Sequence, residues 1–259
     1  MSRPSARSLG HGQNREARQG ARRRGRRDHA LQGEGLTVDA QALPAERALA
    51  VEARPIVVKL GGSVVRSGEL TAWLDAIAAA PQPTIVVPGG GALADEVRAC
   101  QERLGFGDAS AHRMALLAMD QLAWAVAGLR QGFEVGATEE GLRAALGRGS
   151  VGVWAPYALI SGRTDIEESW RLTSDSLALW LAARIGAARC YLIKSIARRR
   201  TRMGAKQLAR EGIVDAAFPS MLKEARIPAS LLGRGDQAAF AAFLSGRDAG
   251  ASSCGAEID

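Results

Sequence analysis

The chain has 259 residues, of which 47% are apolar, 24% are charged and three are cysteine, and its formal net charge is +7. This length suits one large α/β domain, and no apolar run reaches the roughly 18 to 20 residues of a membrane-spanning helix, so we expect no membrane partner. The cysteines share no spacing typical of disulfide frameworks or zinc sites, which favours a cytoplasmic protein without a protein-held metal.

The beginning of the chain carries the excess positive charge. Residues 1–30 hold nine Arg and two acidic residues, whereas the rest of the chain holds 25 basic and 25 acidic groups. With so few apolar residues this segment cannot bury a core, so we expect residues 1–53 to be a disordered leader. The leader is a solvated extension, a segment that binds an acidic surface, or a segment similar to organelle-targeting sequences. Because the body is neutral, nucleic acid is not expected as its partner.

Two strand-to-glycine turns open the folded region. The β-branched run at residues 56–58 predicts a buried strand that leads into Lys59 and a first glycine turn. A second strand at residues 84–87 leads into a second glycine turn, and apolar residues at helical spacing follow from Leu93 to Leu104. We expect this apolar stripe, which includes the leucines at both ends, to face the core.

Strands and helices continue to alternate along the rest of the chain. Strands are expected at residues 151–154, 190–193 and 227–232, and helices at about residues 115–129, 173–185 and 237–244. This order predicts an α/β domain with a mostly parallel sheet covered on both faces. We expect the domain at residues 54–246, followed by a flexible tail at residues 247–259.

The glycine turns indicate a phosphate site of an unusual kind. The chain contains neither a Walker A loop nor a dinucleotide-binding G-x-G-x-x-G motif in a suitable setting. The turns at residues 61–63 and 89–91 nevertheless offer backbone N–H groups without side-chain hindrance, and such groups bind anions. Taken together, the two turns favour phosphate as the ligand.

Lysine usage points to the same edge of the sheet. The chain has 30 Arg but only four Lys, and two of the four, Lys59 and Lys194, end predicted strands. A lysine at the carboxyl end of a parallel strand reaches the crevice in which α/β folds bind ligands. Asp175 lies in the first turn of a predicted helix, where it either compensates the helix dipole or orients the two lysines.

These motifs resemble those of the amino acid kinase superfamily. The similar motifs are Lys59 to Ser63, Pro88 to Gly91, Thr173 to Ser176, and Lys194 after its strand. Within the superfamily, residues 111–121 and 170–178 are most similar to a branch of C1 metabolism. That branch contains the kinase that acts on aminomethyl-furanyl-methyl phosphate in methanofuran biosynthesis, and its relatives in C1-metabolising bacteria.

The resemblance implies a three-layer αβα sandwich that transfers phosphate from ATP to a small acceptor. The acceptor would be a phosphomonoester such as a furan-methyl phosphate, and Mg²⁺ would be bound through the nucleotide phosphates. The implied catalytic residues are Lys59, Asp175 and Lys194. The implied ATP-binding residues are Gly61, Gly62, Ser63, Lys194 and Ser195, and the implied acceptor-binding residues are Gly89, Gly90, Gly91, His112 and Ser174. The resemblance also implies a homo-oligomer.

Two further points stay open at this stage. Several superfamily members have an acidic turn after the strand that precedes Lys194, whereas this chain has Arg at positions 198–200, which either contact nucleotide phosphates or form a solvated loop. A non-catalytic nucleotide-binding or storage protein on the same fold is the alternative function, since a fold does not fix the chemistry.

Overall fold

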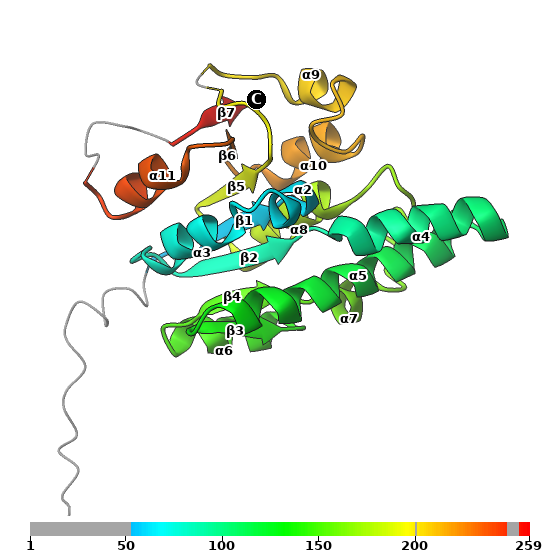
Figure 1. Ribbon diagram of the computed structural model, residues 1–259, viewed down its shortest axis with the longest axis horizontal. Coiled ribbons are helices and arrows are strands. Elements are labelled where there is room, and N and C mark those ends of the chain that lie inside the picture. The colour runs from blue at the N-terminus through cyan, green and yellow to red at the C-terminus, as the bar shows by residue number, and fades with distance from the viewer. Residues whose placement is uncertain (1–52, 200, 248–253) are drawn as a thin grey trace, which may run out of the picture. The chain divides into compact units, whose positions relative to one another are not determined.

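The computed structural model describes residues 53–199, 201–247 and 254–259 (Figure 1). The expected leader at residues 1–53 lies outside the described residues except for its last position. Within the described residues, the strands are β1 Ile56–Leu60, β2 Thr84–Pro88, β3 Phe133–Gly136, β4 Val151–Trp154, β5 Arg189–Ile193, β6 Ala229–Leu232 and β7 Ala256–Ile258. The helices are α2 Gly62–Arg66, α3 Leu70–Ala78, α4 Gly91–Leu104, α5 Asp108–Leu129, α6 Glu139–Gly147, α7 Tyr157–Ile160, α8 Ser174–Ile185, α9 Ala205–Arg210, α10 Phe218–Ala225 and α11 Gln237–Leu244.

The strands form one sheet in the order β3-β4-β2-β1-β5-β6-β7. Every neighbouring pair is parallel except β6 and β7. β1 and β2 are buried along their whole length, as their continuous β-branched sequences predict for central parallel strands. The register places Lys59 opposite Val87 on β2 and Leu192 on β5, so the three strands end at the same edge. The predicted α/β class with a mostly parallel sheet is therefore confirmed.

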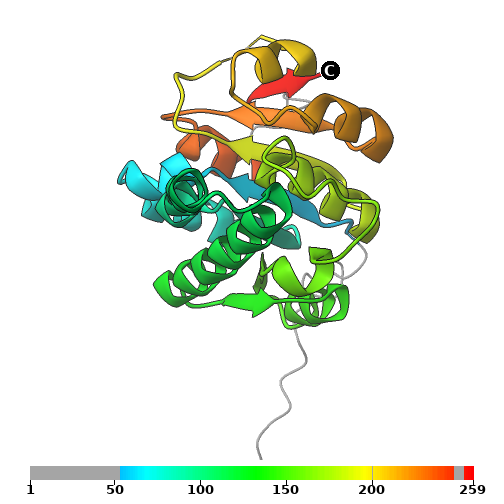
Figure 2. The same ribbon diagram turned by 90° about the vertical axis from the view of Figure 1, so that its right-hand side faces the viewer.

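Helices cover both faces of this sheet, which gives three layers (Figures 1 and 2). Alternate residues of β1 enter different cores, with Val57 on one face and Val58 on the other. The core around Val57 is shared with α8, α9 and α10, and the core around Val58 is shared with α3 and α11. The αβα sandwich expected from the resemblance is thus present.

The helical hairpin of α4 and α5 differs from the sequence prediction. The two helices pack on each other, and they extend past the carboxyl ends of β1 and β2 (Figure 1). The apolar stripe predicted to face the core is therefore only partly covered, since Val97 is buried whereas Leu93 is exposed and Leu104 is 69% exposed. Helical spacing identified one face of α4 correctly, but no layer of the described chain covers that face beyond the sheet.

The expected flexible tail also contains regular structure. β7 lies within residues 247–259 and pairs antiparallel with β6, with Ala256 opposite Leu231. Ala256 and Ile258 are buried whereas Glu257 between them is partly exposed, the alternation typical of an edge strand. Three residues are too few for sequence periodicity to distinguish from coil, so this strand was not predicted.

Candidate functional site

The two glycine turns lie side by side at the carboxyl edge of the sheet. The Gly61 N–H donates to the carbonyl of Ile193 at 2.9 Å, and the Gly89 N–H donates to the carbonyl of Leu60 at 2.8 Å. Each turn thus begins as a continuation of the ladder between neighbouring strands. This geometry joins the end of β1 to β5 on one side and to β2 on the other.

Close backbone contact between the turns requires glycine. A Cβ atom added to Gly62 would lie 2.7 Å from the nitrogen of Gly91, and one added to Gly89 would lie 2.9 Å from the nitrogen of Gly62. Gly91 also has φ of +54°, which other residues rarely adopt. α2 and α4 begin in these turns and neither has a side-chain cap, so their first N–H groups are left for a ligand.

A buried carboxylate joins the two lysines. Lys59 Nζ lies 2.7 Å from Asp175 Oδ1, and Lys194 Nζ lies 2.7 Å from Asp175 Oδ2. The side chains of Lys59 and Asp175 are only 4% and 5% exposed. The sequence left two roles open for Asp175. Its ion pairs with both lysines match the role of orienting them. Its place in the first turn of α8 also lets it compensate the helix dipole.

Burial and charge shift the pKa values in this cluster. Burial lowers the pKa of Lys59 to about 8, although Asp175 partly opposes the shift. Burial by itself raises the pKa of Asp175, but Lys194 and Lys59 together outweigh it and lower the pKa to about 2. Asp175 is therefore a carboxylate throughout the physiological range, and Lys59 has an ammonium that a phosphate would stabilise.

Asp215 fixes the start of α8 and was not identified from the sequence. One of its oxygens accepts hydrogen bonds from Thr173 N and Oγ1, both at 2.9 Å, and from Ser176 N at 3.1 Å. The other oxygen accepts from Ser176 Oγ. Asp215 thus caps the helix turn that contains Asp175. It follows α8 by thirty residues and stands outside any motif, so no local signal marked it.

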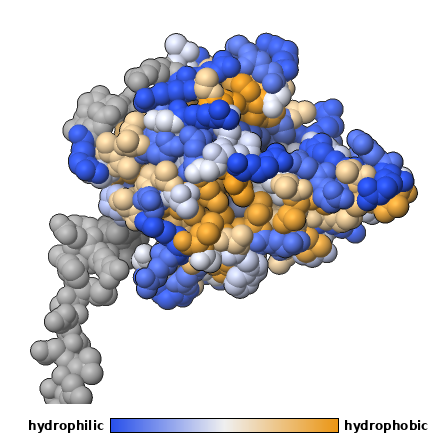
Figure 3. Space-filling model, in the orientation of Figure 1, coloured by the Kyte–Doolittle hydropathy of each residue, from blue (hydrophilic) through white to orange (hydrophobic). Residues whose placement is uncertain are grey.

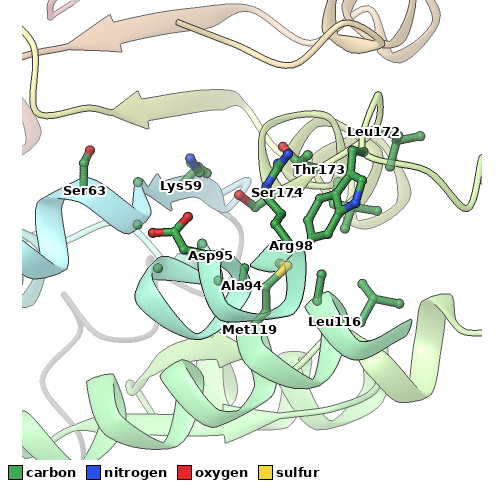
Figure 4. A pocket seen from close by; sticks show the side chains of 18 of the residues that line it. Lys59, Ser63, Ala94, Asp95, Arg98, Leu116, Met119, Leu172, Thr173 and Ser174 are labelled. Atoms are coloured by element: carbon green, nitrogen blue, oxygen red, sulfur yellow. The ribbon is translucent and has the colours of Figure 1, made fainter. Parts of the chain in front are cut away.

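A pocket of about 270 Å³ lies against these elements (Figure 4). The predicted residues that line it are Lys59, Gly61, Gly62, Ser63, Gly89, Gly90, Gly91, His112, Ser174 and Lys194. Asp175 lies beneath it, bound to the two lysines, and Ser195 does not line it. Except for Asp175 and Ser195, all the site residues predicted from the sequence therefore line this pocket.

The pocket also has polar residues that sequence reasoning missed. Arg66, Asp95, Arg98 and Trp170 line it together with apolar side chains of α5 and of the segment before α8. Arg66 donates to Asp95 at 2.7 Å, which links α2 to α4. The helical positions of Asp95 and Arg98 were visible in the sequence, but only the tertiary fold shows that this side of α4 faces the lysines.

His112 lies on α5 at the wall of the pocket. Its Nδ1 is 3.4 Å from the carbonyl oxygen of Ser169, and its Nε2 is buried without a hydrogen-bond partner in the described part of the chain. Burial lowers the pKa of His112, so the ring is neutral at pH 7. His112 therefore offers a neutral imidazole to this side of the pocket.

The arginine run after Lys194 has a structural role at its first two positions. Arg198 pairs with the buried Asp236 at the start of α11, and Arg199 Nη2 lies 3.6 Å from Glu211 Oε2. Position 200 lies outside the described residues. The sequence left two roles open for this run, contact with nucleotide phosphates or a solvated loop. Arg198 has neither role, because its guanidinium neutralises the buried carboxylate of Asp236.

The comparisons with known proteins agree with this geometry. The family model described as "Amino acid kinase family" matches residues 54–198, more than half of the chain. The [5-(aminomethyl)furan-3-yl]methyl phosphate kinase of Methanocaldococcus jannaschii is 26% identical over 129 residues, which cover 48% of this chain and 58% of that protein. The match thus spans less than two thirds of that relative.

Solved structures show the same fold at low sequence identity. Uridylate kinase from Archaeoglobus fulgidus has a TM-score of 0.58 and 18% identity, over 79% of this chain and 99% of that one. UMP kinase from Bacillus anthracis has a TM-score of 0.57 and 14% identity, over 80% of this chain and 96% of that one. Aspartate kinase from Synechocystis has a TM-score of 0.55 and 14% identity, over 79% of this chain and 39% of that one.

Proposed function

Because the chain belongs to the amino acid kinase family, we propose that it is a kinase that transfers the γ-phosphoryl group of ATP to a small acceptor. The observation that carries the proposal is the pair of lysines held by one buried carboxylate beside two glycine turns. Phosphoryl transfer needs aligned reactants and fixed positive charge rather than a nucleophilic side chain. A storage or binding protein would not require two lysine ammonium groups held by one buried carboxylate.

The residues of the pocket divide between the parts of the reaction. An oxygen of the acceptor attacks the γ-phosphorus, the bond from that phosphorus to the bridging oxygen breaks, and ADP leaves with the electron pair. Lys59 stabilises the transferring phosphoryl group, with the N–H groups of Gly62 and Ser63 as further donors. Lys194, with Ser195 next to it, meets the phosphates of ATP as charge develops on the leaving oxygen.

The acceptor lies against the second glycine turn in this proposal. Gly89, Gly90 and Gly91 supply backbone donors, and His112 and Ser174 line the same pocket. A phosphomonoester acceptor already has an anionic oxygen, so its attack needs no general base. The name of the Methanocaldococcus relative supports a furan-methyl phosphate, or a similar phosphomonoester in the synthesis of a C1 carrier, as the acceptor.

Mg²⁺ belongs to the nucleotide in this proposal. Among the described residues, no group of three or more His, Cys, Asp or Glu side chains is arranged to hold a metal ion. Asp175 is already shared by two lysines, so its oxygens are engaged. Mg²⁺ bound through the phosphates of ATP would neutralise part of their charge, whereas the lysines and backbone donors hold the remaining oxygens.

We also propose that the chain forms a homo-oligomer and that it is a cytoplasmic protein. Apolar side chains are exposed along α4 and α5, among them Leu104 and Trp124, and Figure 3 shows hydrophobic residues where α5 lies in Figure 1. Such a surface is typical of a protein interface. None of the helices in the described ranges combines the length and the apolar character that crossing a membrane requires.

An acceptor screen tests the proposed function. ATP consumption by the purified chain is measured with phosphomonoester and carboxylate acceptors, and we expect turnover with phosphomonoesters. Lys59→Met should reduce kcat by on the order of a hundredfold or more, because it removes a preorganised cation from the reacting phosphate. Lys206→Met, an exposed lysine of α9, is the matched control and should keep full activity. Turnover with carboxylates alone would overturn the acceptor class, and absence of turnover would favour the non-catalytic alternative.

A further inference from the structure

A cation and an aromatic ring are stacked at the α4 side of the pocket. The guanidinium carbon of Arg98 lies 3.8 Å from the centroid of the Trp170 ring, and both residues line the pocket. Figure 4 shows Arg98 extending from α4 into the pocket. Stacking on an indole face restricts the guanidinium while leaving its N–H edge open to a ligand.

Hydrogen bonds fix the ring on which Arg98 lies. Trp170 Nε1 donates to Gln101 Oε1 at 2.6 Å, and Gln101 Nε2 donates to Asp108 Oδ1 at 2.7 Å. Arg98 and Gln101 are three residues apart on α4, so they project from the same side of the helix. The indole is thus held by one side chain of α4 and covered by another.

The segment that contains Trp170 is also attached to α5. Arg113 donates to both carboxylate oxygens of Glu168, at 3.0 and 3.1 Å, and His112 Nδ1 is 3.4 Å from the Ser169 carbonyl. Residues 168–170 are therefore held by both helices of the hairpin. The ring on which Arg98 stacks is therefore in place before any ligand binds.

The ion pairs of the pocket leave Arg98 available. Lys59 and Lys194 share Asp175, and Arg66 is paired with Asp95. In the part of the chain that the structure describes, Arg98 forms no ion pair with a carboxylate. Its guanidinium is therefore free to bind an anionic group of a ligand, and the fork of N–H donors matches a phosphate.

We infer that Arg98, positioned by Trp170, binds the phosphate that the acceptor already has and so favours phosphomonoesters over uncharged acceptors. This inference rests on the proposed phosphotransfer. The lysines and the first glycine turn are occupied with the phosphates of ATP, so an acceptor phosphate needs a separate cation. Arg98 supplies that cation from α4, about two helical turns beyond the second glycine turn at which this helix begins.

Steady-state kinetics of Arg98→Gln and Arg98→Lys test the inference. With a phosphomonoester acceptor, Arg98→Gln should raise the acceptor KM at least about tenfold and leave the KM for ATP within about twofold. Arg98→Lys should restore only part of the loss, because a lysine cannot present a two-pronged donor. Arg103→Gln, an exposed arginine of α4 outside the pocket, is the matched control and should leave both constants unchanged.

Changing the ring separates positioning from structure. Trp170→Phe keeps an aromatic face and should increase the acceptor KM less than Trp170→Leu does. If Trp170→Leu does not fold, the exposed Arg98 substitutions and Trp170→Phe carry the test by themselves. An unchanged acceptor KM in Arg98→Gln would overturn the inference while leaving the kinase activity intact.

A binding measurement keeps the inference testable if no acceptor is turned over. Calorimetric titration of phenyl phosphate into the protein saturated with a non-hydrolysable ATP analogue should show about tenfold weaker binding to Arg98→Gln than to the unchanged chain. Equal binding to both proteins would contradict the inference. Absence of turnover together with weaker binding would instead reject the proposed reaction but not the role of Arg98.

Discussion

Asp175 gives one carboxylate oxygen to each of two lysines, and this sharing sets the charge of the site. Asp175→Asn would leave two ammonium groups close together without a counterion. Because breaking a buried ion pair is strongly destabilising, we expect a loss of about 3 to 5 kcal/mol in the free energy of unfolding, and a fall in kcat of about a hundredfold. Urea denaturation and kinetics measure both. Asp95→Asn, at an exposed ion pair, should cost at most about 1 kcal/mol of stability.

The lowered pKa of Lys59 predicts proton uptake when ATP binds. In the free protein the pKa is about 8, because burial disfavours the ammonium. Bound phosphates favour the charged form and raise this pKa, so the complex holds more protons than the free protein near pH 8. Calorimetry in two buffers of different ionisation enthalpy should show fractional uptake at pH 8 and almost none at pH 6. Affinity for ATP should fall as pH rises above 8, and pH-independent binding from pH 6 to 9 would contradict the assignment.

At the scale of single elements, the start of α8 depends on a carboxylate from a distant loop. Asp215 accepts four hydrogen bonds from Thr173 and Ser176, on either side of Asp175 in the sequence. Burial and the nearby charge of Asp175 raise the pKa of Asp215. Its hydrogen bonds offset this unfavourable electrostatic environment only in part, but they hold the helix turn that contains Asp175.

Asp215→Asn should separate this positioning role from simple stability. An amide replaces one acceptor oxygen by a donor, so we expect the free energy of unfolding to fall by about 1 to 3 kcal/mol. Since the helix start would shift, kcat should fall about tenfold or more while the KM for ATP changes little. Asp165→Asn, at an exposed pair with Arg163, serves as the control. An unchanged kcat with reduced stability would show that Asp215 only supports the fold.

The contact between the glycine turns gives a second prediction at this scale. A Cβ atom at Gly62 would lie 2.7 Å from Gly91 N, so Gly62→Ala must push the two turns apart. Because a shift of about 1 Å disrupts alignment for transfer, kcat/KM should fall by about a hundredfold. Gly128→Ala is the matched control, since an added Cβ meets nothing within 4 Å there and alanine is the better helix residue. Equal kinetics for Gly62→Ala and the unchanged chain would exclude an essential contact.

At the scale of the whole molecule, the exposed apolar side chains of α4 and α5 predict self-association. Trp124 is 69% exposed on α5. If this surface joins two copies, Trp124→Glu should place a charge in the interface and shift the mass measured by light scattering toward the monomer. Ser220→Glu, at an exposed position of α10, adds the same charge elsewhere and should leave the mass unchanged. A monomeric unchanged chain would contradict the oligomer proposal.

Local patterns predicted most of the central fold and most of the residues that lie together in the candidate site. β1, β2 and β5 are short buried runs that end at glycine or lysine, so both their type and the edge at which they meet follow from the sequence. The lysines stood out because the chain otherwise prefers arginine. Asp175 was found because a carboxylate in a first helical turn is a local feature.

Long-range contacts explain what the sequence did not predict. Asp215, Arg98 and Trp170 have partners far along the chain. Asp215 and Arg98 lie outside the sequence motifs, and Trp170 begins the run 170–178 without any feature that pairs it with α4. The exposed stripe of α4 had the periodicity of a core face, which reports amphipathicity but not which surface covers it. Side-chain identity and periodicity describe single elements, whereas these features arise from how the elements pack.

The backbone contact between Gly62 and Gly91 also has a thermodynamic consequence. In the proposed reaction one glycine turn binds the donor and the other binds the acceptor. Because the two turns are in contact, a ligand that orders one turn changes the binding free energy at the other. Such coupling is reciprocal: ATP must alter the affinity for the acceptor by the same factor by which the acceptor alters the affinity for ATP. The two substrates would therefore bind cooperatively through a few atoms of main chain, without any movement of domains.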